Sequence, residues 1–289
     1  MADVIQRTTR RPEKFRILII GRANAGKTTI LRAVCGAEGE PDVYDKDGNK
    51  VPDAALAESG ERGEHNVEYS LMFPSSPGFV FHDSRGFESG AVDELELVRK
   101  FIRDKASLGS VQNQLHAIWY VYCFSTDSNR FMTAADKEFF DTIDTGSVPV
   151  IAIFTKFDAL DSVAFSALTA EGVPFEEAQR RAPEHAQTQF DQHVLPLIKE
   201  VAHPPRAVVY LRRLDIIQRA ASKLIESTEA ALDDSALKVL LVQAQHVNVE
   251  FCMKGAVNRC VAGLPLLYMT EFSVHIVELS QRLHRVMFC

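Results

Sequence analysis

The sequence contains few cysteines, and their spacing does not suit a zinc site or a disulfide framework. None of the five forms a CxxC pair, and they are scattered along 289 residues: Cys35, Cys123, Cys252, Cys260 and Cys289. An odd and scattered set argues against a disulfide-stapled domain and is typical of a reducing compartment. We therefore expect most of these cysteines to be small core residues.

The sequence also lacks an excess of positive charge and any long apolar run. Its net charge of −7 argues against non-specific binding of nucleic acid over the whole surface. No stretch of about 18 apolar residues predicts a transmembrane helix, and the first residues lack an apolar signal segment. We expect a cytoplasmic protein with no fixed-period repeat, and its 46% hydrophobic residues are enough for a large core.

The most informative stretch is FRILIIGRANAGKTTI, residues 15–30. An apolar run over 15–20 predicts a buried strand, Gly21 to Thr28 match the pattern G-x-x-x-x-G-K-[ST], and residues 29–34 continue as a helix. Backbone N–H groups of such a loop converge on phosphate oxygens. Lys27 can reach the β- and γ-phosphates, and the Thr28 hydroxyl can bind Mg²⁺. The alternative is a chance loop between a strand and a helix.

Two later motifs end predicted strands. The segment 79–83 leads into Asp83-Ser84-Arg85-Gly86, in which the aspartate can hold Mg²⁺ through water and the N–H of Gly86 can approach a γ-phosphate. The run 148–158 ends in TKFD. The Asp158 carboxylate can accept hydrogen bonds from guanine N1–H and the 2-amino group, which adenine does not offer, and the Lys156 stem can cover the base.

The order of these elements predicts a three-layer α/β fold. Strands over 15–20, 116–124, 148–158 and 206–211 alternate with helices over 91–106, 133–143 and 215–232, which predicts a doubly wound, mainly parallel sheet. The alternating run 65–73 forms a hairpin with 79–83 and adds one antiparallel edge strand. We divide the chain into a flexible tail (1–14), a nucleotide-binding domain (15–232) and a C-terminal helical extension (233–289).

Several segments leave alternatives or specific expectations. Residues 36–65 form a long acidic connection, in which DKDGN is an acidic turn or, less simply, a calcium loop. Residues 159–202 look helical, with breaks near Pro174 and Pro183. Thr133 is a candidate helix cap. The helices after 233 either pack on the domain or contact a partner or a membrane surface.

With these motifs in this order, the chain resembles a P-loop GTPase domain of the translation-factor class. The loop GRANAGKTT is similar to Era/TrmE-like GTPases, the TKxD form is similar to septins and GIMAP proteins, and the whole chain resembles fungal G domain-containing proteins. The resemblance covers roughly residues 15–230. It implies phosphate binding by Gly21, Ala23, Asn24, Ala25, Gly26, Lys27, Thr28 and Thr29, Mg²⁺ binding by Thr28 and Asp83, and guanine binding by Thr155, Lys156 and Asp158. In Era/TrmE-like domains an asparagine in the place of Asn24 helps to bind K⁺; the alternative is a loop-stabilising amide.

The sequence departs from this family at three places. No threonine lies between Thr29 and Thr126, where the family supplies one to Mg²⁺, although His65 or Ser59 could substitute. Phe87 follows DSRG, where Ras-like domains have a water-orienting glutamine. The base loop after Leu211 begins with two arginines instead of a small residue and alanine. The similar fragment VQAQ, residues 242–245, lies within a helical pattern.

These observations lead to competing functional hypotheses. The first is a GTP-binding switch with catalytic residues Lys27, Thr28, Asp83 and Gly86, which hydrolyses GTP slowly because no evident general base is present. The second is a nucleotide-binding interaction module with little or no turnover. An ATP-using kinase is disfavoured by TKFD. The family also implies GTP or GDP and Mg²⁺ as ligands, K⁺ as a further one, and a nucleotide-dependent homodimer or an effector protein as partner.

Overall fold

The computed structural model describes residues 14–52, 66–85, 92–106, 113–124, 132–212 and 217–245. In chain order the elements are β1 (Phe15–Gly21), α1 (Lys27–Cys35), β2 (Asp42–Tyr44), β3 (Ser70–Met72), β4 (Phe79–Arg85), α3 (Val92–Ala106), β5 (Ala117–Cys123), α4 (Ala134–Thr142), β6 (Val150–Thr155), α5 (Ala159–Ala170), α6 (Phe175–His193), α7 (Leu195–Lys199), β7 (Ala207–Tyr210), α8 (Ile217–Ala231) and α9 (Ser235–Ala244).

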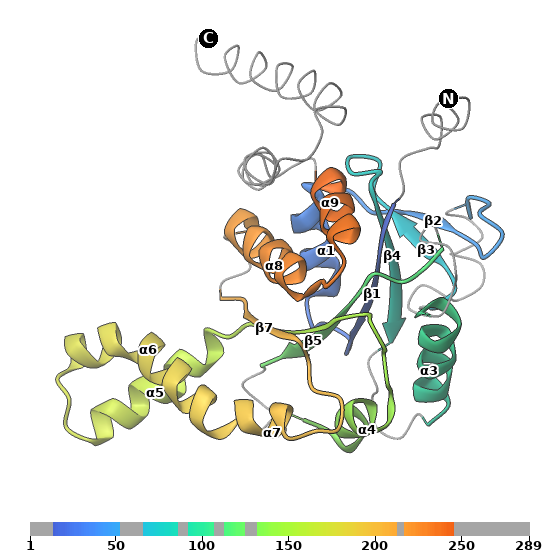
Figure 1. Ribbon diagram of the computed structural model, residues 1–289. Coiled ribbons are helices and arrows are strands. Elements are labelled where there is room, and N and C mark those ends of the chain that lie inside the picture. The colour runs from blue at the N-terminus through green and yellow to red at the C-terminus, as the bar shows by residue number, and fades with distance from the viewer. Residues whose placement is uncertain are drawn as a thin grey trace, which may run out of the picture.

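The described strands form one seven-stranded sheet in the order β2-β3-β4-β1-β5-β6-β7 (Figure 1). The strands β4, β1, β5, β6 and β7 are parallel, whereas β3 is antiparallel to both of its neighbours. This confirms the predicted α/β class and the antiparallel addition at one side. Because β1, β4 and β6 run in the same direction, their carboxyl ends lie at one edge of the sheet.

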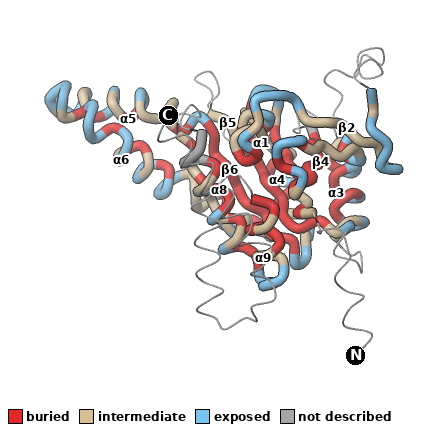
Figure 2. The backbone as a smooth tube through the Cα atoms, turned by 90° about the horizontal axis from the view of Figure 1, so that it is seen from above, coloured by how far each residue is buried: buried red, intermediate tan, exposed pale blue. Residues whose placement is uncertain are grey.

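Helices cover both faces of the sheet, and alternation along β1 separates the two cores. Ile17 and Ile19 belong to the cluster shared with α1, α8 and α9, while Leu18 and Ile20 belong to the cluster shared with α3, α4, α6 and α7. Figure 2 shows buried residues concentrated in the sheet and on the helix sides that face it. Each fully buried aliphatic side chain stabilises the fold by about 1.5–3 kcal/mol, which favours this three-layer arrangement.

The antiparallel region differs in detail from the prediction. The strand predicted over 65–73 is observed only as β3, because Asn66 makes a turn in which its side chain accepts a hydrogen bond from the Glu68 N–H at 3.0 Å. The connection predicted over 36–65 contains a short strand that the sequence pattern did not indicate, since β2 pairs with β3. The acidic-turn interpretation of DKDGN is confirmed, because the Asp45 carboxylate accepts hydrogen bonds from the N–H groups of Asp47 and Asn49.

Helices α5 and α6 project from the body of the molecule as a hairpin (Figures 1 and 2). The predicted break at Pro174 is confirmed, because this proline caps α6 in an extended conformation. The predicted break at Pro183 is wrong, since α6 continues through it. Pro183 is exposed, whereas Ala182 and Ala186 pack against α5 and Phe190 enters the main core, so packing outweighs the one backbone hydrogen bond that proline removes.

The last described helix, α9, packs in the core that β1 shares with α1 and α8. Leu240, Leu241 and Val242 are buried with residues of β1. A Cβ at Gly78, just before β4, would lie 2.6 Å from the Cα of Ala244, so only glycine permits this approach. The fragment VQAQ lies in the last turn of α9 and its C-cap, as its helical pattern indicated. The contact of Ala244 with Gly78 places it at the end of β4 opposite to the β1 loop. Residues 1–13 and 246–289 lie outside the described residues.

Two further expectations concern helix ends and membranes. The prediction that Thr133 caps a helix is confirmed, because its hydroxyl accepts a hydrogen bond from the Asp136 N–H and the Asp136 side chain bonds back. None of the helices in the described part of the chain combines the length and apolar character that a bilayer crossing requires.

Candidate functional site

The glycine-bounded loop connects β1 to α1 at the carboxyl edge of the sheet. Gly21 ends β1 where a Cβ would lie 2.8 Å from the Val121 carbonyl oxygen of β5, so the close approach of the two strands requires glycine. Gly26 has φ of 89° and Asn24 has φ of 58°, both in the left-handed region that glycine and asparagine tolerate best. These two positions bend the chain so that α1 begins at Lys27.

The Lys27 side chain lies within this loop and is only 8% exposed. It donates hydrogen bonds to the carbonyl oxygens of Gly21 at 2.6 Å and Arg22 at 3.3 Å. Its distance to the Asp83 carboxylate, which is itself 7% exposed, is 3.8 Å. The pairing follows from the sheet, because β4 lies beside β1 with Asp83 in register with Ile19. The predicted lysine and aspartate are thus brought together.

This arrangement is that of a phosphate-binding loop at the carboxyl edge of a parallel sheet, between a buried strand and a helix N-terminus. The fold is that of a P-loop nucleoside triphosphatase. The remaining predicted loop residues differ in exposure: Ala23, Asn24 and Thr28 are exposed, Gly26 and Thr29 are half-buried, and Ala25 is buried. Gly86, Phe87, Ser59 and His65 lie outside the described residues.

The donor set fits a hard cation such as Mg²⁺. The Thr28 hydroxyl is exposed at the start of α1, and the Asp83 carboxylate reaches the same loop through Lys27. Magnesium is usually held by one or two carboxylates together with phosphates, so one aspartate and one hydroxyl are a sufficient protein contribution. Within the described ranges, no group of three histidine, cysteine or acidic side chains forms a separate metal centre.

The TKFD motif at the end of β6 is joined directly to this loop. The Thr155 hydroxyl is fully buried and lies 2.8 Å from the Ala25 carbonyl oxygen and 3.1 Å from that of Tyr122. Lys156, with φ of 51°, donates to the Asn24 carbonyl oxygen at 3.4 Å. The structure therefore brings both ends of the predicted site together, with Thr155 acting as a tie between strand and loop.

Aromatic side chains pack around Phe157, the third residue of the TKFD motif. Phe157 is fully buried, and its ring centroid lies 4.8–5.6 Å from those of Phe124, Phe190 and Tyr210. Asp158 follows as a half-buried residue at the start of α5. The buried ring one residue before it fixes the backbone between β6 and α5, from which the Asp158 carboxylate extends.

The base loop after β7 is only partly described, because residues 213–216 lie outside the described ranges. Arg212 lies with its guanidinium 4.8 Å from the Phe157 ring centroid, forms an ion pair with Asp161, and donates to the Pro183 carbonyl oxygen at 2.9 Å. Sequence reasoning treated this arginine only as a departure from the family. Its contacts show that it joins the base loop to both α5 and α6.

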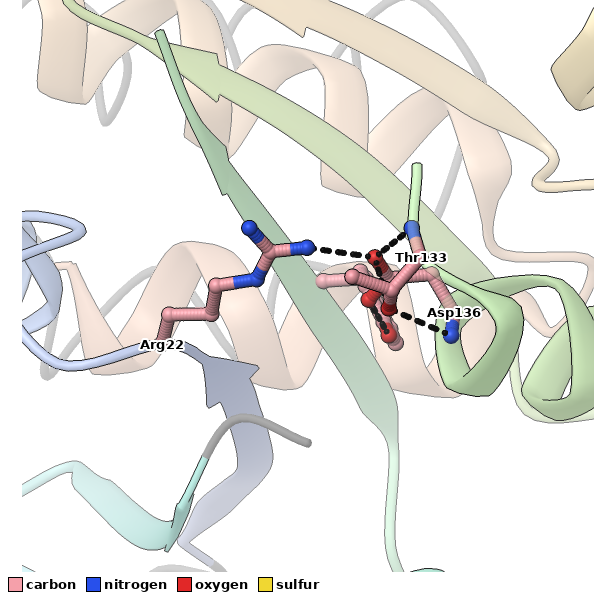
Figure 3. Close-up of polar contacts among 4 residues, drawn as sticks. Arg22, Thr133 and Asp136 are labelled. Carbon is pink, nitrogen blue, oxygen red and sulfur yellow. Dashed lines mark hydrogen bonds and ion pairs between the residues drawn. The ribbon is translucent and has the colours of Figure 1, made fainter. Parts of the chain in front are cut away.

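Sequence reasoning also missed Arg22 and Asp136. Arg22 occupies a variable position of the loop pattern, and its guanidinium forms an ion pair with Asp136 at 3.0 Å (Figure 3). The spacing of Thr133 and Asp136 was a detectable capping-box signal. Nothing in the sequence indicated that the same carboxylate would meet the phosphate loop, because the two residues are 114 positions apart.

Comparisons with known proteins add little to this geometry. No protein-family model and no curated protein matches the chain. Among solved structures, a GTP-binding protein from Sulfolobus solfataricus in complex with GDP is 12% identical with a TM-score of 0.38, covering 75% of this chain and 53% of that one. A variant of Era from Aquifex aeolicus, bound to GDP·AlF4⁻, is 12% identical with a TM-score of 0.35, covering 77% and 58%. The chain thus spans less than two thirds of these structures, and similarity this low carries no functional assignment.

Proposed function

We propose that this protein binds guanine nucleotides with Mg²⁺ and hydrolyses GTP slowly, acting as a nucleotide-dependent switch. The observation that carries the proposal is the direct contact between the TKFD motif and the phosphate loop, through Thr155 to Ala25 and Lys156 to Asn24. One nucleotide could therefore meet Lys27 with its phosphates and Asp158 with its base. A carboxylate at that position selects guanine, because guanine presents two adjacent donors.

The residues of the loop account for the chemistry. Lys27 would stabilise negative charge that develops on the transferred phosphoryl group, and the loop N–H groups would orient it. Thr28 and Asp83 would hold Mg²⁺, which when bound adds positive charge at the phosphate oxygens. K⁺ beside Asn24 is a further proposed ligand. A cytoplasmic location, and a homodimer or effector as partner, stay predictions.

The assignment of the base is tested by titrating the protein with fluorescent GDP, GTP and ATP, with and without Mg²⁺. We expect guanine nucleotides to bind at least about tenfold more tightly than ATP, since loss of a paired hydrogen-bonding edge is worth more than about 1.4 kcal/mol. Asp158→Asn should shift the preference toward xanthine nucleotides. The matched control is Asp144→Asn, which alters an exposed carboxylate that precedes the opposite end of β6. Tight ATP binding by the wild type would overturn the proposal.

A second candidate is a nucleotide-binding module without turnover. The absence of any threonine between Thr29 and Thr126 favours it, because this removes the usual switch ligand of Mg²⁺. Phosphate release from GTP, measured in Na⁺ and in K⁺ buffers, separates the two. Turnover that is faster in K⁺ supports the first candidate and the role of Asn24. GTP that stays bound and intact for hours supports the second.

A further inference from the structure

Arg22 connects the phosphate loop to the buried carboxylate of Asp136, both of whose oxygens accept hydrogen bonds. Asp136 is only 4% exposed, and its Oδ2 accepts hydrogen bonds from the Arg22 guanidinium at 3.0 Å and from the Thr133 backbone N–H at 2.7 Å (Figure 3). The Thr133 hydroxyl lies 2.7 Å from the same oxygen. Oδ1 accepts a hydrogen bond from the Tyr120 hydroxyl at 2.6 Å. Three points of the fold, on β5, α4 and the loop, therefore meet at one side chain.

The other groups fix Asp136 independently of Arg22. Burial, followed by the neighbouring Tyr122 and the Asp136 charge, raises the pKa of Tyr120 well above its ordinary value, so its phenol stays protonated and donates. The capping box holds the carboxylate at the first turn of α4. Arg22 supplies the positive charge in this group, while the Tyr120 phenol and the Thr133 N–H and hydroxyl contact the carboxylate without it. Asp136 is therefore a rigid anchor to which the arginine attaches.

The backbone of the same arginine holds the loop together. The Arg22 carbonyl oxygen accepts hydrogen bonds from the Ala25 N–H at 3.2 Å, which closes the turn, and from the Lys27 ammonium at 3.3 Å. Fixing the Arg22 side chain restricts the rotation of its backbone and so the direction of this carbonyl. The position of the lysine thus depends on an anchor outside the loop motif.

We propose that Arg22 and Asp136 are positioning residues of the phosphate loop, which orient the Lys27 ammonium and the loop N–H groups toward a nucleotide phosphate. This role rests on the proposed nucleotide-binding function and adds to it the residues that position the loop. In this role neither residue contacts the phosphate itself. Placement of charged donors within about 0.5 Å controls how well such a site binds.

The first test compares two arginines of equal exposure. Arg22 and Arg206 are each 34% exposed and each pair with one aspartate, but Arg206 precedes β7 at the opposite end of the sheet. Arg22→Ala should weaken GDP binding about tenfold and GMP binding less than about threefold, because the loop acts on the terminal phosphate. Arg206→Ala should change neither by more than about twofold. Arg22→Lys, which keeps the charge, should recover part of the GDP affinity.

The second test measures hydrogen exchange of the loop in the absence of nucleotide. Hydrogen exchange of peptides covering residues 15–30 should become faster in Arg22→Ala and in Asp136→Asn, and stay unchanged in Arg206→Ala. If Asp136→Asn does not fold, Arg22→Ala and Arg22→Lys carry the test, since this side chain is partly exposed. Faster exchange together with selective loss of GDP affinity supports the inference.

Each other outcome is decisive. GDP affinity that falls without faster exchange would mean that Arg22 contacts the phosphate directly, and faster exchange without loss of affinity would mean that the anchor does not serve binding; both overturn the inference. Unchanged exchange and affinity overturn it as well. If the wild type binds no guanine nucleotide, the proposed function fails, and the exchange measurement alone then decides whether Arg22 and Asp136 position the loop.

Discussion

At the phosphate end of the site, Lys27 is nearly buried and bonded to two loop carbonyls, whereas at the base end Lys156 is exposed and touches the loop through one 3.4 Å contact. The residues that support these two lysines also differ. The loop is anchored by charged and polar groups around Asp136, while the TKFD motif stands on the aromatic side chains around Phe157. The proposed phosphate site and the proposed base site therefore depend on different interactions, which can be weakened separately.

The largest effect is expected from removing the hydrophobic anchor of the base end. Phe157→Ala should lower the free energy of unfolding by about 3–5 kcal/mol, because it deletes a fully buried ring from a packed cluster. Urea unfolding followed by fluorescence measures this loss. Phe157→Leu keeps most of the volume and should lose much less. A loss below about 1 kcal/mol for the alanine variant would show that aromatic packing does not support this end.

The stability of the fold should depend on pH through His82, which precedes Asp83 in β4. Burial, followed by the charges of Arg16 and Lys105, lowers the pKa of His82 from 6.5 to about 4, while its Nδ1 bonds the carbonyl oxygens of Val67 and Tyr69. Because the unfolded chain binds the proton more readily, stability is complete above pH 6.5 and falls as the pH drops toward 4. The loss reaches ~3 kcal/mol.

This pH dependence is checked by urea unfolding of wild type and His82→Gln between about pH 4 and pH 8. The wild type should lose stability relative to the variant as the pH falls below 6.5. His193→Gln, at an exposed position, is the control. A constant difference between wild type and His82→Gln over the whole range contradicts the prediction.

At the phosphate end itself, Lys27→Ala should weaken GDP binding about 100-fold. Charge-assisted hydrogen bonds contribute about 1.5–3 kcal/mol, and each 1.4 kcal/mol is a factor of ten in affinity. Guanine should still be preferred over adenine in the residual binding, because Asp158 is untouched. Competition titration measures both quantities, with Lys199→Ala as an exposed control. GTP hydrolysis that survives in Lys27→Ala would exclude this lysine from catalysis.

The smallest effect is expected at the contact between the base loop and the projecting hairpin. Arg212→Ala removes the ion pair with Asp161 and the bond to the Pro183 carbonyl, and should lower stability by about 1 kcal/mol. Arg181→Ala, which removes only an exposed pair with Glu177, should lose about 0.3–0.5 kcal/mol. Equal losses in the two variants would mean that Arg212 adds no more than an ordinary surface pair.

Much of the phosphate loop was predictable because its determinants are local. A buried strand, two glycines, a lysine and a helix follow one another within 16 residues, so hydrophobic periodicity and loop chemistry indicate them without knowledge of distant contacts. The cap at Thr133 was predictable for the same reason. The wrong break at Pro183 has the opposite cause, because local proline chemistry was outweighed by packing of the next turn against α5.

Residues that are neighbours in the chain thus specify which strands are buried, where the phosphate loop turns and which motif follows β6. The pairing of Arg22 with Asp136, and the contacts by which Arg212 joins the base loop to α5 and α6, arise only when the strands assemble in their final order. That order brings together residues far apart in the chain. A pattern of residue types cannot predict these contacts, because ion pairs depend on distance in space and not on spacing in sequence.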